Sequence, residues 1–166
     1  MRRMQCNKLM ENLISSFPRS RHRTFLVDFE GLQKLFNKKI VKIVDTFIIE
    51  EVHESIDVEV AEKNFDKLIR MNTDKTGYES SCNEFRIIDY FSETLSVEDQ
   101  WEIGMIVMEN FLQKEDFPFP CIFYYGYDES ILTMRFHKYR ASEGLWLLED
   151  LEGYSNPVAY FHIEEN

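Results

Sequence analysis

Several residue types that would mark a specialised class of protein are scarce in this chain of 166 residues. Its three cysteines, Cys6, Cys82 and Cys121, lie far apart and form no C-x-x-C pair. This spacing argues against a disulfide framework and against a structural zinc site, and it suits a reducing cytoplasm. The 6 glycines and 4 prolines are too few for a fibrous or linker-rich protein.

Long apolar runs are also missing. The two most apolar windows are KIVKIVDTFII, which charged residues interrupt, and IGMIVM, which is too short to span a bilayer. The start of the chain, MRRMQCNKLMENLISSF, has basic residues but no unbroken apolar core of the kind that a signal peptide needs. We therefore expect a cytoplasmic protein without a membrane partner.

Basic residues are few relative to acidic ones, with 19 Lys and Arg against 30 Asp and Glu and a net charge of −11. Residues 1–45 carry ten basic and four acidic side chains, whereas residues 46–166 carry nine and twenty-six, a net charge of −17. A field of this sign repels nucleic acid and anionic membranes and attracts cationic proteins. High charge also keeps a small protein soluble without implying any partner.

The remaining composition predicts a folded α+β protein. A 44% hydrophobic content at this length suits one domain over residues 1–166. Ser96 and Asp99 have the spacing of a capping box at the start of the longest predicted helix. Apolar residues recur at helical spacing in residues 9–17, 29–36, 61–69, 85–91 and 97–112.

Two stretches of the first half admit two interpretations. Residues 40–48 contain β-branched side chains that favour a strand, but Ile40, Val44 and Phe47 also make a helical stripe, and we interpret the stretch as a helix. The polar run at residues 72–82 predicts a surface loop, with a hinge between the two halves of the chain as the alternative.

Strands are predicted only near the end of the chain. CIFYYGY and ILTMRFHKY read as a hairpin, and VAYFHI reads as a last strand. Between them, SEGLWLLEDLEGY predicts a helix with Ser142 as its cap and Leu147, Leu151 and Tyr154 on one side. The expected fold is therefore helical over its N-terminal two-thirds, with a small antiparallel sheet in the C-terminal third and one helix between the strands.

Motifs for nucleotide or hydrolase chemistry are absent, since the chain has no phosphate-binding glycine loop, no G-x-S-x-G and no H-E-x-x-H. Glu50 and His53 have the spacing of two metal ligands on one helix face, but a carboxylate-bridged site needs a second such pair. We expect no metal and no cofactor. The best catalytic alternative is the pair His137 and His162 beside Arg135, as acid and base for a phosphodiester substrate.

One cluster of basic residues precedes the acidic part of the chain. Nucleic-acid binding would need these side chains to converge on one face with aromatic residues among them, and the overall charge opposes it. We interpret the cluster as a solvated loop or as an internal counterpart to the acidic half, and its members are Arg19, Arg21, His22, Arg23, Lys34, Lys38, Lys39 and Lys42.

The acidic stretch after residue 142 is the best candidate for a binding surface. Trp and Tyr are frequent anchors in protein interfaces, and neighbouring carboxylates can pair with Arg or Lys of a partner. An ordinary amphipathic helix with Trp146 packed on the sheet is the alternative. The candidate contact residues are Glu143, Trp146, Glu149, Asp150, Glu152 and Tyr154.

The order of elements in ILTMRFHKYRASEGLWLLEDLEGYSNPVAYFHI resembles the C-terminal part of bacterial immunity proteins of contact-dependent growth inhibition and other polymorphic toxin systems. This resemblance implies a cytoplasmic antitoxin that binds one cognate toxin domain, commonly a nuclease, beside or over its active site. Because a nuclease must be cationic where it holds nucleic acid, an acidic binder can compete with its substrate. The alternatives are a small hydrolase or nuclease using His137 and His162, and an acidic adaptor or inhibitor of a DNA-binding protein.

Overall fold

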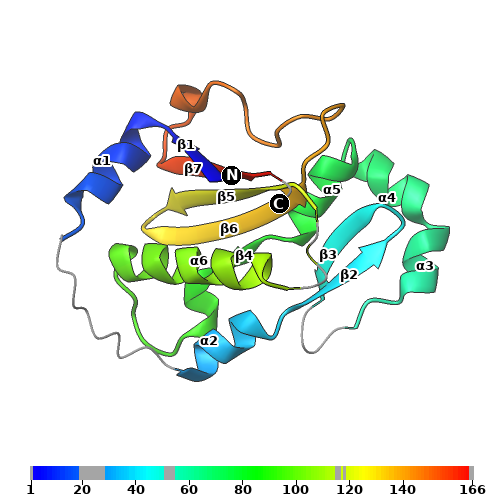
Figure 1. Cartoon of the computed structure of the whole chain (residues 1–166), viewed down its shortest axis with the longest axis horizontal. Helices are drawn as coiled ribbons and strands as arrows, with labels where there is room; N and C mark the ends of the chain where they lie inside the picture. Colours follow the sequence, from blue (N-terminus) through cyan, green and yellow to red (C-terminus); the bar gives the residue numbers. More distant parts are fainter. Residues whose placement is uncertain (1, 19–28, 51–54, 115–116, 118, 165–166) are drawn as a thin grey trace.

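The computed structural model describes residues 2–18, 29–50, 55–114, 117 and 119–164, and in these ranges the chain forms two antiparallel sheets and a set of mostly short helices (Figure 1). The strands are β1 (Arg2–Cys6), β2 (Lys39–Ile43), β3 (Thr46–Glu50), β4 (Phe85–Arg86), β5 (Cys121–Asp128), β6 (Ile131–Lys138) and β7 (Val158–Ile163). The helices are α1 (Lys8–Ser16), α2 (Phe29–Phe36), α3 (Val58–Lys63), α4 (Phe65–Met71), α5 (Lys75–Cys82) and α6 (Val97–Leu112), with short 3₁₀ turns η1 (Ile87–Tyr90) and η2 (Leu151–Gly153).

The larger sheet has five strands in the order β1-β7-β5-β6-β4, and the smaller one is the β2–β3 hairpin. The first strand of the chain thus lies at the edge of the larger sheet, paired with the last strand. The predicted confinement of the sheet to the C-terminal third is wrong, and so is the predicted helical N-terminal two-thirds.

The β2–β3 hairpin replaces the helix that we predicted for residues 40–48. Val44 takes a left-handed backbone conformation with φ of 56°, which reverses the chain between the two strands. Ile40 and Ile43 are buried in β2, and Ile48 and Ile49 are buried in β3. The β-branched residues therefore decided the structure here, because tertiary packing overrides a weak helical stripe.

Helix α5 occupies most of residues 72–82, where we expected a loop. The Asp74 side chain accepts a hydrogen bond from the backbone N–H of Gly77 (2.7 Å) and caps this helix. The Glu79 side chain of α5 and the side chain of Asn83, just after the helix, form hydrogen bonds with the backbone of both β3 and β6. These two polar side chains can be buried because they form hydrogen bonds with the backbone of the strands. A hydropathy pattern does not reveal such bonds.

The two faces of the larger sheet are covered differently (Figure 1). Phe123 and Tyr125 of β5 and Phe136 of β6 point to the helix side, where they share one apolar core with α6. Ile122, Tyr124 and Tyr160 point to the opposite face, where residues 139–157, here called the covering segment, pack on them. No helix in the described ranges is both long enough and apolar enough to cross a membrane.

Candidate functional site

The covering segment is irregular, so the helix predicted for SEGLWLLEDLEGY is not formed. Gly144 has φ of +79°, and its N–H donates to the carbonyl of Arg140 (2.8 Å), which closes a tight turn. The backbone N–H of Trp146 donates to the Tyr124 hydroxyl (2.8 Å), and the N–H of Leu148 donates to the Tyr154 hydroxyl (3.0 Å). Tyrosine hydroxyls thus take the place of the carbonyls that would accept these bonds in a helix.

The Tyr124 hydroxyl also connects the segment to a buried histidine. Nδ1 of His137 lies 2.7 Å from the carbonyl oxygen of Lys138, which can only accept, so Nδ1 carries the hydrogen. Nε2 then accepts from the Tyr124 hydroxyl at 2.9 Å. Burial lowers the pKa of His137 to about 4 and raises the pKa of Tyr124, so both side chains are neutral at pH 7.

A buried ion pair anchors the start of the covering segment. Nη1 and Nη2 of Arg140 donate to the two carboxylate oxygens of Glu79 at 2.8 and 2.9 Å, and the Glu79 side chain is fully buried. The same carboxylate accepts from the backbone N–H groups of Phe47 (2.8 Å) and Lys138 (2.8 Å). Glu79 therefore joins β3, β6 and the covering segment at one point.

Asp45, in the β2–β3 turn, adds a second charged link. It pairs with Lys138 at 2.6 Å and with Lys75 at 3.3 Å. The hydrogen bond from Lys138 lowers the pKa of Asp45 to about 2, although partial burial acts in the opposite direction. One helical turn from Glu79, Asn83 accepts from Ile49 N–H (2.7 Å) and donates to the carbonyl of Phe136 (3.2 Å), so the hairpin is bonded to the larger sheet through side chains.

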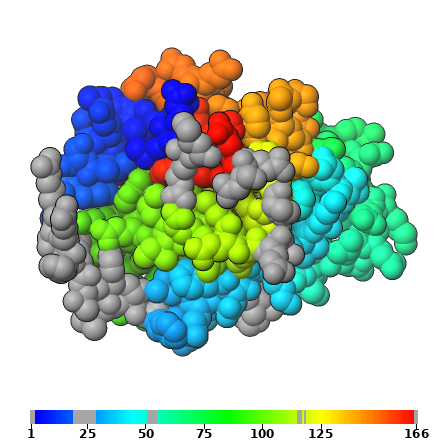
Figure 2. Space-filling view, viewed as in Figure 1, coloured from blue at the N-terminus to red at the C-terminus, as the bar shows by residue number. Residues whose placement is uncertain are grey.

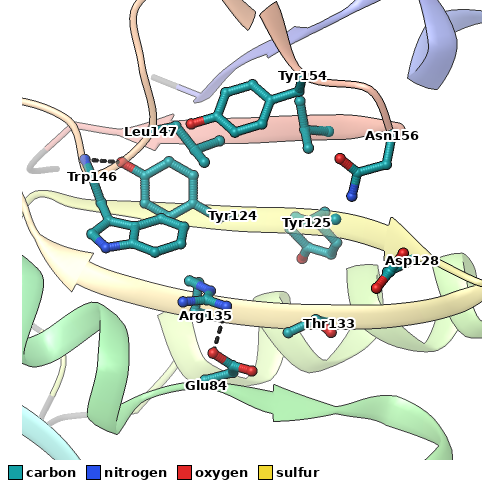
Figure 3. Close-up of a pocket in the computed structure, with 12 residues that line it drawn as sticks. Glu84, Tyr124, Tyr125, Asp128, Thr133, Arg135, Trp146, Leu147, Tyr154 and Asn156 are labelled. Carbon is teal, nitrogen blue, oxygen red and sulfur yellow. Dashed lines mark hydrogen bonds and ion pairs between the residues drawn. The ribbon is translucent and has the colours of Figure 1, made fainter.

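A pocket of about 350 Å³ lies between the covering segment and the sheet (Figure 3). Gly126 of β5 forms part of its floor, with Thr133 and Val158 opposite it on the two neighbouring strands. A Cβ atom built on Gly126 would meet only a Val158 methyl group, at 3.9 Å, so the missing side chain leaves free space. The other lining residues include Tyr124, Leu147, Trp146, Tyr154, Asn156, Arg135, Glu84 and Asp128.

The charged groups of the pocket differ in how far their charge is neutralised. Arg135 forms an ion pair with Glu84, and its guanidinium lies 4.1 Å from the centre of the Trp146 ring. The side chain of Asp128 has no hydrogen bond or ion pair within the described ranges. Figure 3 places Arg135 and Trp146 at one end of the pocket and Asp128 with Asn156 at the other.

Of the predicted contact residues, three are engaged within the protein. Glu143 accepts from the N–H and the hydroxyl of Thr76, both at 2.8 Å, and it is mostly buried. Glu152 accepts from the backbone N–H of Lys8 at 2.8 Å and so links the segment to α1. Asp150 accepts from the N–H of Glu152 at 3.1 Å, but its carboxylate is exposed.

The other three differ in how far they are exposed. Trp146 is 38% exposed, and the neighbouring Leu148, which we did not single out, is 65% exposed. Glu149 is exposed and has no ion pair among the described residues. Tyr154 is half-buried and lines the pocket. Figure 2 shows the covering segment, in orange, along the upper surface of the molecule.

The two histidines of the catalytic alternative do not come together. His137 and His162 both pair with Ile122, one from each side, so β5 lies between them. His137 is buried with both ring nitrogens bonded, while His162 packs on the Tyr139 ring at 4.6 Å between centroids. Arg135 is held by Glu84. This arrangement does not offer an acid and a base to a shared substrate.

The basic cluster is not one surface where it is described. Lys38 is buried and its ammonium lies 4.9 Å from the centre of the Tyr90 ring, while Lys34 pairs with Glu30 on α2 at 2.8 Å. Lys39 and Lys42 are exposed on β2. Five further residues lie outside the described ranges: Arg19, Arg21, His22, Arg23 and His53. Among the residues that the structure describes, no group of three or more His, Cys, Asp or Glu side chains could hold a metal ion.

The pocket residues Gly126, Asp128 and Glu84 were missed at the level of sequence. One signal was present: a glycine inside the aromatic strand CIFYYGY marks a place where a strand leaves room for another group. The path of the covering segment determines which residues close the space above Gly126. Local sequence patterns did not predict this path.

Comparisons with known proteins place the chain in a family. No curated protein and no solved structure matches it. Residues 5–166, which include every strand of the larger sheet except most of β1, match the family described as Uncharacterized protein PM0498 family. The chain belongs to that family.

Proposed function

We propose that the protein is an immunity protein that binds and neutralises a cognate bacterial toxin domain, a nuclease, through the acidic surface of the covering segment. The observation that carries the proposal is the exposure of Trp146 and Leu148 beside the carboxylates of Glu149 and Asp150. An exposed tryptophan is a frequent anchor of protein interfaces, and neighbouring carboxylates can pair with basic residues at the polar rim of the contact.

The covering segment is also tethered to the rest of the protein at several points. Hydrogen bonds to Tyr124 and Tyr154 fix the backbone at Trp146 and Leu148, and Glu152 ties the far end to α1. Leu147 and Leu151 are buried between these points. A surface ordered in advance loses little conformational entropy on binding, which favours tight association.

Charge supports a cationic partner. The net charge of −17 over residues 46–166 attracts a positively charged protein and speeds its association. A nuclease is positively charged where it holds its substrate, so carboxylates can occupy the same groups as nucleic-acid phosphates. The proposal involves no catalysis, no cofactor, no nucleic-acid contact and no membrane, and it places the protein in the cytoplasm.

Affinity capture tests this function. The tagged chain is recovered from its own cells at low and at moderate salt, and retained proteins are identified by mass spectrometry. We expect one stoichiometric basic protein with toxin activity, retained more strongly at low salt because the attraction is electrostatic. Retention of no protein, or of a DNA-binding regulator without toxin activity, would contradict the proposal.

A further inference from the structure

The pocket above Gly126 is bounded by both the larger sheet and the covering segment. Its floor is open because Gly126 has no Cβ atom, and any group there would lie between Thr133 and Val158 of the neighbouring strands. Leu147 and Tyr154 of the covering segment close the opposite side (Figure 3). These apolar and aromatic walls suit a chain of methylene groups.

The polar groups at one end of the pocket lack hydrogen-bond donors. The carboxylate of Asp128 has no partner among the described residues, and Asn156 uses its amide nitrogen to donate to the carbonyl of Tyr127 (3.0 Å). The carboxylate of Asp128 and the amide oxygen of Asn156 therefore remain as acceptors. Lysine and arginine side chains consist of a methylene stem and a head that only donates, which matches this arrangement.

The positive group at the other end does not favour an anionic ligand. Arg135 is already paired with Glu84 and covered on one face by the Trp146 ring. The charges of the three ionised lining residues, Glu84, Arg135 and Asp128, leave one negative charge, and it lies at the Asp128 end. The negative field of the whole chain adds to this preference.

We propose that this pocket receives one lysine or arginine side chain of the protein partner, with the stem over Gly126 between Leu147 and Tyr154 and the charged head at Asp128 and Asn156. This inference rests on the proposed function, since the toxin supplies the side chain. It identifies an anchor position next to the exposed Trp146, where the energy of an interface is usually concentrated.

Capped amino acids test the pocket without the toxin. Nα-acetyl-L-arginine amide and Nα-acetyl-L-lysine amide are titrated into the protein, and the backbone signal of Gly126 and the indole N–H signal of Trp146 are followed by NMR. The neutral isosteres Nα-acetyl-L-citrulline amide and Nα-acetyl-L-norleucine amide are the controls. We expect weak, saturable shifts of both signals with at least one cationic probe and much smaller shifts with its isostere.

Two variants test whether the NMR shifts come from binding in this pocket. Gly126→Val fills the floor, and Asp128→Asn removes the charge at the head position, so each should abolish the shifts. Gly153→Val is the matched control, because a Cβ atom there meets no atom within 4 Å and Gly153 does not line the pocket. Equal shifts with the neutral isosteres, shifts that survive Asp128→Asn, or no saturable shift would overturn the inference. Binding of Nα-acetyl-L-glutamate amide at the Arg135 end instead would also overturn it.

The same variants separate this inference from the proposed function. If a basic toxin is retained by the wild type, Gly126→Val should weaken its binding at least about tenfold. If the toxin is retained equally by Gly126→Val, the immunity function stands and the anchor position is wrong. If the cationic probes bind but no toxin is retained, the pocket stands and the immunity function fails.

Discussion

The two faces of the larger sheet are closed by different means, and the difference explains where the candidate site lies. On the helix side, Trp101 and Phe111 of α6 pack against Tyr125, Phe123 and Phe136 in a continuous aromatic core. On the loop side, the covering segment buries a smaller apolar cluster and leaves a pocket above the strands.

The contrast follows from the hydrogen bonds of the backbone. A helix satisfies its own N–H and carbonyl groups, so α6 can present an apolar stripe to the sheet. The covering segment has no such internal pattern, and it depends on Tyr124, Tyr154 and the buried Glu79–Arg140 pair. Polar tethers fix its course without filling the space beneath it, and Trp146 is left exposed.

The largest effect should come from breaking the anchor of the loop side. Glu79→Ala leaves the buried guanidinium of Arg140 with only the more distant carboxylates of Asp45 (3.7 Å) and Glu143 (4.0 Å), and it leaves two backbone N–H groups without an acceptor. We expect a loss of about 3–5 kcal/mol of unfolding free energy. Denaturant titration measures this loss. Glu79→Ala with Arg140→Met should be less destabilising than Glu79→Ala alone, because the guanidinium that has lost its bidentate partner is also removed. A double variant that is more destabilised would show that the pair is not coupled as described.

His137 should make the loop side sensitive to acid. Its pKa is lowered to about 4 by burial, whereas the unfolded chain binds the proton near the ordinary value of 6.5. Its contribution to stability is complete above pH 6.5 and is lost as the pH falls toward 4, by about 3 kcal/mol in all. His137→Gln should remove this part of the pH dependence between 6.5 and 4. An unchanged slope in the variant would mean that His137 does not cause it.

Substitutions at two glycines, Gly104 on the helix side and Gly126 on the loop side, allow the packing of the two faces of the larger sheet to be compared. A Cβ atom on Gly104 of α6 would lie 3.0 Å from Tyr125 and 3.1 Å from Leu132, whereas one on Gly126 would meet only Val158 at 3.9 Å. Gly104→Val should therefore destabilise the protein by about 1–3 kcal/mol. Gly126→Val should change the stability by less than about 0.5 kcal/mol or increase it slightly, since valine suits a strand. Thermal and denaturant unfolding of both variants would reveal equal losses if the faces were packed alike.

Asp45 should produce a small effect that depends on pH. The hydrogen bond from Lys138 lowers the pKa of Asp45 to about 2, so its contribution is complete above pH 4 and disappears as the pH falls through 2. Because the side chain is 44% exposed, solvent screening reduces this contribution to about 1 kcal/mol. The difference in stability between wild type and Asp45→Asn, measured from pH 5 to pH 2, should shrink toward zero in acid. If the difference in stability stayed constant from pH 5 to pH 2, ionisation of Asp45 would not be its cause.

Sequence patterns predicted the structure correctly where a short segment determined its own structure. Helix α6 begins after Ser96 with the predicted capping box to Asp99, and β5 and β6 form the predicted hairpin. Sequence patterns failed where contacts with residues distant in the sequence determine the local structure. Trp146 bonds to a hydroxyl 22 residues away and Glu152 to an N–H 144 residues away, so residues 142–154 do not form a helix. The polar helix α5 was missed for the same reason.

The candidate site was partly predictable. The exposed Trp146, Glu149 and Asp150 lie in the segment that composition alone singled out, while Glu143 proves to be a structural link to Thr76. The pocket depends on the contact between this segment and Gly126, and only the fold brings them together.

The most direct test of the central claim is a capture experiment with two matched charge reversals. Glu149→Lys with Asp150→Lys changes the covering segment, and Glu59→Lys with Glu62→Lys changes exposed residues of α3, at the far right of Figure 1, by the same total charge. We predict that the first variant retains on the order of tenfold less of the basic partner at low salt, mainly because association is slower, while the second behaves like the wild type. Equal retention by both variants would contradict a binding surface on the covering segment.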